Sequence, residues 1–174
     1  TSIPDVKKYL DEFLMDKRVI GKSYIFRWIL VKLIILNTRP KKSAKAYKKI
    51  WWKEGSPLIV LSQRLFEKVK KFINIPVALA MRYGSISINK GIKELYESGV
   101  NEIVVLPLYP HYAMSSYETV VEKVKDEVKN NFPGVNLKIV SPFYKERNYI
   151  NLLSSKIKET IKKIKYDHIL FSYH

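Results

Sequence analysis

The chain has no cysteine among its 174 residues. This absence excludes a disulfide framework, a thiolate metal site and a cysteine nucleophile. It also fits a reducing compartment, so we expect a cytoplasmic protein. The GxGxxG and Walker A patterns are missing too, which leaves a nucleotide-binding function without its usual phosphate loop. The most apolar run, residues 24–36, is too short to span a bilayer and is interrupted by Arg27 and Lys32.

Acidic residues are scarce: 16 Asp and Glu stand against 32 Lys and Arg, a formal net charge of +16. Most lysines lie on the polar side of helical patterns and are mixed with glutamates, which favours a solvated surface over a nucleic-acid interface. No helix-turn-helix, zinc-finger, KH or RNP pattern accompanies them, so we expect no nucleic-acid partner. Anionic small molecules or anionic lipid surfaces suit the charge equally well.

Residues 1–74 read as a helical region. Ser2 is placed to cap a first helix, and further helices are expected over about 22–36, 41–53 and 56–72. The second of these carries Trp28, Ile29 and Leu33 on an apolar face. That face is compatible either with core packing or with a lip that contacts a membrane surface.

Residues 75–174 change to a pattern of strands that alternate with helices. We expect strands within 76–84, 101–109, 136–144 and 167–174, separated by helices of 10 to 20 residues. This alternation predicts βαβ units and hence an α/β fold, a parallel sheet with helices on both faces. The two regions together are expected to form one domain.

Aromatic side chains and two of the three histidines gather at the carboxyl ends of the predicted strands, whereas the amino ends are plain by comparison. In an open parallel sheet, ligands bind beyond these ends. The residues there are Met81, Arg82 and Tyr83, then Tyr109, His111, Tyr112, Met114, Ser115 and Ser116, then Phe143 and Tyr144, and finally Ser172, Tyr173 and His174. Such an edge suits a flat, largely apolar and partly anionic ligand, with Arg82 as a partner for a carboxylate or phosphate.

The three histidines differ in the roles that their positions suggest. His168 opens a predicted strand at the far end from this edge and is interpreted as structural. His174 lies at the edge, where it could donate a hydrogen bond to a backbone carbonyl, bind a metal or act as a general base. His111 follows a proline in a loop and could simply shape a turn. No paired-histidine spacing indicates a zinc site made by the protein alone.

Several stretches resemble the first half of bacterial ferrochelatases in order and spacing: "GSPLIVLSQRL", "VALAMRYGS", "EIVVLPLYPHYAMSS" and the terminal "ILFSYH". The opening "DVKKYLDEFLMDKRVI" and "RPKKSAKAYKKIW" are similar to the lip region of that family. The resemblance covers essentially the whole chain. It implies an enzyme that inserts ferrous iron into a porphyrin, protoporphyrin IX or coproporphyrin III, in haem biosynthesis, and a chelatase-like lobe from a two-lobe protein.

The resemblance also implies roles for particular residues. His174 matches the histidine usually held essential, so it is the expected catalytic base and metal-contacting group. The expected porphyrin-binding residues are Arg82, Tyr83, Tyr109 and Ser115, with Trp28, Ile29 and Leu33 in the hydrophobic lip. The expected partners are porphyrin and Fe²⁺, both substrates, and peripheral contact with a membrane is compatible with the lip.

Two departures from the family pattern stand out. Family members begin with a strand and continue through a second α/β lobe, and we expect both to be absent from this chain. Some members also have a cysteine where Met114 stands, tied to an iron–sulfur cluster; with no cysteine, no such cluster and no cofactor are expected here. A cobalt or nickel chelatase and a non-catalytic porphyrin- or anion-binding module remain the alternatives.

Overall fold

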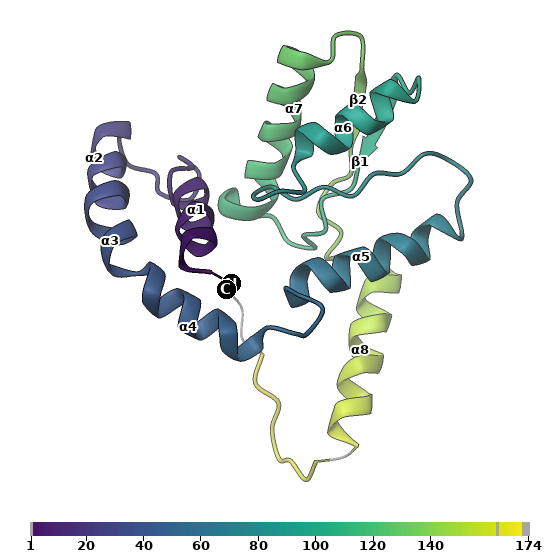
Figure 1. Ribbon diagram of the computed structural model, residues 1–174. Helices are drawn as coiled ribbons and strands as arrows, with labels where there is room; N and C mark the ends of the chain where they lie inside the picture. The colour runs from purple at the N-terminus through teal and green to yellow at the C-terminus, as the bar shows by residue number, and fades with distance from the viewer. Residues whose placement is uncertain (1, 163, 172–174) are drawn as a thin grey trace.

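The computed structural model describes residues 2–162 and 164–171. Figure 1 shows a helical region formed by the first part of the chain and an α/β unit formed by the later part. The elements are α1 (Ile3–Leu14), α2 (Tyr24–Trp28), η1 (Ile29–Ile35), α3 (Leu36–Thr38), α4 (Pro40–Ile50), α5 (Pro57–Lys70), α6 (Ile88–Glu97), β1 (Glu102–Val105), η2 (Met114–Glu118), α7 (Thr119–Asn131), β2 (Asn136–Ile139) and α8 (Arg147–Ile161). As predicted, helices come first, and the two strands that form alternate with helices.

Helix α1 begins as its sequence predicts. The Ser2 hydroxyl accepts a hydrogen bond from the backbone N–H of Asp5, and the Asp5 carboxylate accepts one from the backbone N–H of Ser2, both at 3.2 Å. This reciprocal pair is a capping box, and Pro4 occupies the first turn, where its missing N–H costs no helical hydrogen bond. Local chemistry therefore accounts for the start of this helix.

The helical region packs around a small core of its own. Elements α2, η1 and α3 follow one another without a break, and the middle element, η1, is π-helical. Helix α1 lies against both η1 and α4. The buried residues of this core are Val6, Leu10, Val31, Leu36 and Ala44. Val31 is fully buried, whereas the other side of the same helix faces outward.

The sheet of the α/β unit is parallel, with Glu102 paired to Asn136 and Val105 to Ile139. Ile103 points from β1 into the second core, which α6 and α7 supply with Ile88, Ile92, Val124 and Val128. Phe132 and Val135 complete this core. Val104, on the opposite face, is 59% exposed. The predicted α/β class with a parallel sheet is confirmed, and helices α6 and α7 share one face of it.

Two of the four expected strands are absent from the described residues. Within 76–84, Met81 makes a single bridge to Ser87, and Ala78 and Ala80 pack against α6 at Gly91 instead of joining β1. Residues 167–171 form no strand, and Leu170 is 94% exposed. Apolar runs predict burial, but a strand also needs a neighbouring backbone to bond with, and these segments have none among the described residues.

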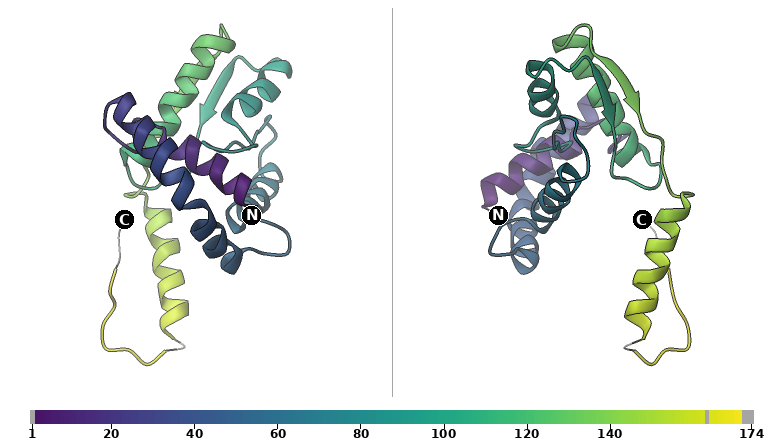
Figure 2. Two further views of the ribbon diagram at one scale, coloured as in Figure 1. Left: turned by 60° about the vertical axis from the view of Figure 1, so that its left-hand side comes forward. Right: turned by 90° about the vertical axis from the view of Figure 1, so that its right-hand side faces the viewer.

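Helices α5 and α8 contribute no buried residue. Figure 2 shows α8 extending away from the sheet in both views. Their apolar side chains, such as Leu58 at 67% and Leu152 at 63% exposed, therefore meet solvent in this chain. The predicted boundary near residue 74 between the helical region and the α/β unit stays a prediction.

Candidate functional site

The loops that follow the two strands meet at the carboxyl edge of the sheet. The backbone N–H of Tyr144, after β2, donates to the carbonyl of Pro110, after β1, at 2.9 Å. The rings of His111 and Tyr144 stack with centroids 5.5 Å apart, and the Tyr117 hydroxyl donates to the Val140 carbonyl at 3.0 Å. The predicted convergence of these two strand ends is therefore confirmed.

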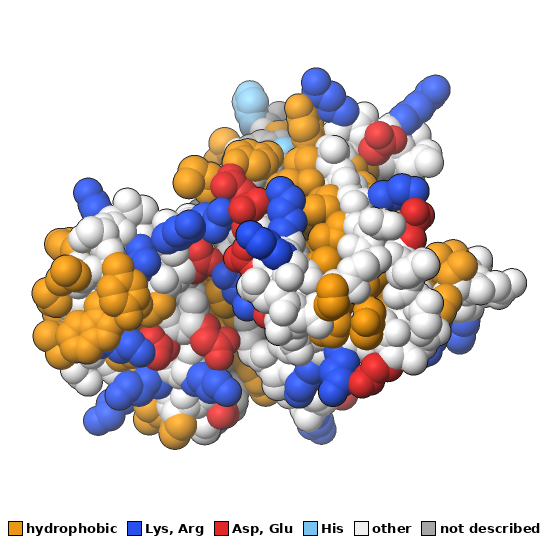
Figure 3. All heavy atoms as spheres, turned by 90° about the horizontal axis from the view of Figure 1, so that it is seen from above, with side chains coloured by type: hydrophobic (Ala, Val, Ile, Leu, Met, Phe, Trp, Pro, Cys, Tyr) orange, Lys and Arg blue, Asp and Glu red, His pale blue; other side chains and the backbone are white. Residues whose placement is uncertain are grey.

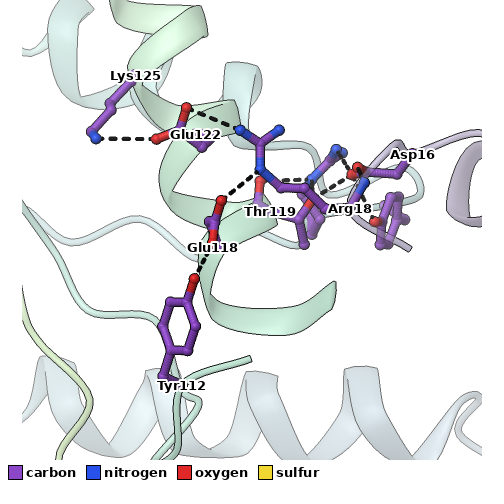
Figure 4. A network of polar contacts seen from close by, with 9 residues as sticks. Asp16, Arg18, Tyr112, Glu118, Thr119, Glu122 and Lys125 are labelled. Carbon is purple, nitrogen blue, oxygen red and sulfur yellow. Dashed lines mark hydrogen bonds and ion pairs between the residues drawn. The ribbon is translucent and has the colours of Figure 1, made fainter. Parts of the chain in front are cut away.

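Arg82 and Tyr83 are held beside the same edge by a carboxylate from the helical region. Asp16, two residues after α1, accepts hydrogen bonds from the Arg82 guanidinium, the Tyr83 hydroxyl at 3.1 Å and the Thr119 hydroxyl. Figure 4 shows Asp16 beside Thr119, which belongs to the first turn of α7. Three segments far apart in sequence thus meet at one carboxylate.

The ring of Tyr83 is enclosed by aromatic neighbours from α1. Phe13 meets it edge-on with centroids 5.4 Å apart, and Tyr9 does so at 6.3 Å. The Arg82 guanidinium lies over the same ring, 4.4 Å from its centroid. Such contacts fix the orientation of the ring and add to what its burial contributes.

Burial and neighbouring charges determine the pKa values of Tyr83 and Tyr109. Burial raises the pKa of Tyr83 to about 12, and the neighbouring Asp16 carboxylate acts in the same direction against the Arg82 charge. Burial also raises the pKa of Tyr109, and the charge of Arg82 acts in the opposite direction. Both phenols are therefore neutral hydrogen-bonding groups near pH 7 and not bases.

A second set of ion pairs joins the helical region to α7. The Arg18 guanidinium donates to Glu118 at 3.3 Å and to Glu122 at 3.1 Å, and Glu122 also accepts from Lys125 at 3.1 Å (Figure 4). The Tyr112 hydroxyl donates a hydrogen bond to the Glu118 carboxylate. In Figure 3, charged side chains of both signs gather near the middle of the face shown.

An open pocket of about 420 Å³ lies beside these ion pairs. Its lining residues are Lys17, Arg18, Gly21, Lys22, Met114 and Glu118. Ser115, expected to bind porphyrin, is exposed in η2 directly after Met114. It does not cap that helix, whose N-cap residue is Ala113. Ser115 lies in the helical turn before Thr119, the residue that contacts Arg82.

The remaining expected site residues lie elsewhere. Trp28, Ile29 and Leu33 are 41%, 45% and 56% exposed, on the outward side of α2 and η1. Hydrophobic side chains gather on that side of the molecule in Figure 3. His174 lies outside the described residues. The structure therefore brings Arg82 and Tyr83 together at Asp16 but leaves the lip residues on a separate surface.

Sequence reasoning did not identify Asp16, Thr119, Tyr9 or Phe13 as part of this cluster. Asp16 and Thr119 are 103 residues apart, and neither stands at the carboxyl end of a predicted strand, where ligands are expected to bind. The one local signal was an acidic residue directly before the basic pair Lys17 and Arg18, just after a helix. Among the described residues, no group of three or more His, Asp or Glu side chains is arranged to hold a metal ion.

Known proteins are similar to this chain over its whole length. The family described as Ferrochelatase matches residues 1–174. A ferrochelatase of Opitutus terrae is 45% identical over 177 residues, which cover 100% of this chain and 51% of that protein. One of Coxiella burnetii is 42% identical over 99% of this chain and 48% of its own length. One of Pseudomonas fluorescens is 42% identical over 100% of this chain and 51% of its own length.

The chain therefore spans about half the length of the curated relatives that it matches. The matched residues, 1–174, span both the helical region and the α/β unit. Family membership rests on the whole chain and not on one motif. The chain belongs to the ferrochelatase family.

Proposed function

We propose that the full-length protein is a ferrochelatase, which inserts Fe²⁺ into protoporphyrin IX or coproporphyrin III in haem biosynthesis. The observation that carries this proposal is the family match over residues 1–174, together with relatives at 41–45% identity that bear that name. Fe²⁺ and porphyrin are the substrates. Because the chain has no cysteine, it offers no thiolate ligand for an iron–sulfur cluster, and the proposal invokes no cofactor.

The cluster around Arg82 supports a planar, partly anionic substrate. Tyr109 provides a partly exposed aromatic ring, and the phenols of Tyr83 and Tyr109 both stay protonated near pH 7 because burial raises their pKa values. Arg82 uses Nε and Nη2 for Thr119 and Asp16, and no described residue accepts a hydrogen bond from its Nη1. That nitrogen is our candidate partner for a porphyrin propionate, with the exposed hydroxyl of Ser115 as a second.

Metal insertion requires a base. Fe²⁺ replaces two pyrrole protons, so the products are the iron porphyrin and two protons, with no change in oxidation state. We assign the first proton to the imidazole of His174, which also contacts the entering metal, since a neutral imidazole accepts a proton near pH 7. The Tyr83 phenol, with a pKa of about 12, is unsuited to that task.

The outward side of α2 and η1 supports a further part of the proposal, peripheral contact with a membrane. Trp28, Ile29 and Leu33 are exposed there, and between residues 17 and 53 the chain has 12 Lys or Arg and no Asp or Glu. Apolar area flanked by cations is typical of a surface that binds anionic lipid. No helix among the described residues is long and apolar enough to cross a membrane. We place the protein in the cytoplasm with this surface against the bilayer.

Porphyrin binding followed by metallation tests the function. The full-length protein is titrated into porphyrin while the Soret band is recorded, and Zn²⁺, a redox-stable substitute for Fe²⁺, is then added. We expect a saturable shift of the Soret band and then the spectrum of zinc porphyrin, formed faster than without protein. Saturable binding with no metallation above background would instead leave a porphyrin-binding module.

A further inference from the structure

We propose that Asp16 is a positioning residue for the porphyrin site, acting through Arg82 and Tyr83. The proposal rests on the proposed function, because it assigns Arg82 and Tyr83 to porphyrin binding. Asp16 itself comes from the helical region, not from a strand end, and is not expected to touch the substrate.

The Asp16 side chain is buried and held by several hydrogen bonds. Its side chain is only 5% exposed. Oδ2 accepts from Arg82, Tyr83 and Thr119, while Oδ1 accepts from the backbone N–H of Arg18 at 2.8 Å. A buried carboxylate with this many donors is held in one place, and it holds its donors in turn.

The backbone of Asp16 is also fixed. Its N–H donates to the Phe13 carbonyl at 3.3 Å, and its own carbonyl accepts from the N–H groups of Val19 and Ile20 at 3.0 and 3.1 Å. The carboxylate therefore stands on a hydrogen-bonded turn at the end of α1, a rigid support for the groups that it binds.

Arg82 is oriented from two sides. Its Nε donates to the Thr119 carbonyl at 3.0 Å and to the Thr119 hydroxyl at 2.8 Å, while Nη2 donates to Asp16. These bonds fix the plane of the guanidinium, so they also fix the direction in which Nη1 can donate. Removing the carboxylate frees that plane to rotate, and it releases the Tyr83 hydroxyl at the same time.

The test is a double-mutant cycle on the full-length protein with Asp16→Asn and Arg82→Gln. Porphyrin Kd is measured from the Soret band, and KM and kcat from zinc insertion. We expect Asp16→Asn to raise Kd and KM about tenfold, in line with the loss of a charge-assisted hydrogen bond, and to change kcat less. If Asp16 acts through Arg82, adding Asp16→Asn to Arg82→Gln changes Kd little further.

The control is Asp11→Asn. Asp11 lies on α1 and pairs with Lys32 at 2.5 Å, so this variant removes the same charge from the same helical region without touching Arg82 or Tyr83. Its porphyrin Kd is expected to match that of the wild type. If Asp16→Asn does not fold, Thr119→Val removes the hydroxyl between Asp16 and Arg82 and is expected to weaken binding, whereas Thr119→Ser keeps the hydroxyl and should restore it.

The outcomes separate the two proposals. A wild-type protein that binds no porphyrin contradicts the proposed function. A wild type that binds, with Asp16→Asn and Thr119→Val binding equally well, overturns the positioning role alone. A lower melting temperature for Asp16→Asn with unchanged Kd would also overturn it, since Asp16 would then only stabilise the fold. Fully additive effects of Asp16→Asn and Arg82→Gln would show that Asp16 does not act through Arg82.

Discussion

At the residue scale, the Asp16 carboxylate joins its own segment to two others that are distant in sequence, through Arg82, Tyr83 and Thr119. Burial by itself would raise its pKa. The hydrogen bonds from Thr119 and from the backbone of Arg18, together with the Arg82 charge, outweigh burial and lower the pKa below the ordinary value of 3.8. The ionised form is therefore the one that the fold stabilises, and it is fully present at neutral pH.

The lowered pKa predicts how stability varies with pH. Because the folded state binds a proton at Asp16 less readily than the unfolded chain does, Asp16 stabilises the fold at pH values above about 4. That contribution is lost as the pH falls through the lower pKa of the folded state. We expect the free energy of unfolding to decline more steeply between about pH 5 and pH 2 in the wild type than in Asp16→Asn, measured by urea denaturation.

At pH 7 the same variant should lose about 2 kcal/mol of unfolding free energy, the usual contribution of hydrogen bonds to a charged group. Asp11→Asn is the comparison, because the ion pair of Asp11 with Lys32 is more exposed than that of Asp16 with Arg82. If the free energy of unfolding varied with pH in the same way in the wild type and in Asp16→Asn, the lowered pKa of Asp16 would be contradicted.

Residues differ in how far local sequence determines their surroundings. The capping of α1 by Ser2 was predictable because both partners lie within four residues. Arg82 was expected at the end of a strand that does not form, and its ion pair with Asp16 joins residues 66 positions apart, which no local pattern records. Pairings of this kind need the packing of α1 against the α/β unit to be known first.

At the element scale, Gly91 lets α6 approach the extended segment 76–84. A Cβ built on Gly91 would lie 3.2 Å from the Ala80 Cβ and 3.6 Å from that of Ala78. This close approach allows the segment to pack on α6 although it pairs with no strand. A larger side chain at residue 91 would force the two apart.

We therefore expect Gly91→Val to reduce the free energy of unfolding by about 1–3 kcal/mol, measured by thermal or urea denaturation. Gly21→Val is the matched control, because nothing lies within 4 Å of a Cβ at Gly21 and its φ is not positive. An equal loss in both variants would show that the contact with Ala80 is unimportant.

The lip gives a second prediction at this scale. Leu33→Gln removes exposed apolar area from η1 and should reduce binding of the full-length protein to anionic vesicles severalfold. Leu152→Gln makes the same change at an equally exposed leucine of α8 and is expected to leave binding unchanged. Sedimentation with phosphatidylserine vesicles measures both. Equal binding by Leu33→Gln and the wild type would remove the lip from the membrane proposal.

Helices were easier to predict than strands. Each expected helix has a counterpart, although α4 ends at Ile50 rather than near 53 and the lip helix contains a π-helical stretch. A helix bonds within its own segment, so periodicity and caps suffice to predict it. A strand bonds with another segment, and the runs at 76–84 and 167–171 find no such partner in the described chain.

At the scale of the whole molecule, two hydrophobic cores are joined by polar contacts. The helical core around Val31 and the core around Ile103 share no residue, and the Asp16 and Arg18 ion pairs bridge between them. The formal charge of +16 is concentrated in part between residues 17 and 53, on the helical region. Binding to anionic surfaces should therefore weaken with added salt.

The central claim is that the full-length protein places Fe²⁺ in a porphyrin with His174 as the base. The measurement that tests it most directly is the anaerobic initial rate of iron porphyrin formation by the wild type and by His174→Ala, with porphyrin binding recorded in parallel. We predict catalysed insertion by the wild type, and nearly unchanged porphyrin binding with insertion abolished in the variant. A wild type that binds porphyrin yet forms iron porphyrin no faster than the uncatalysed reaction would contradict the account.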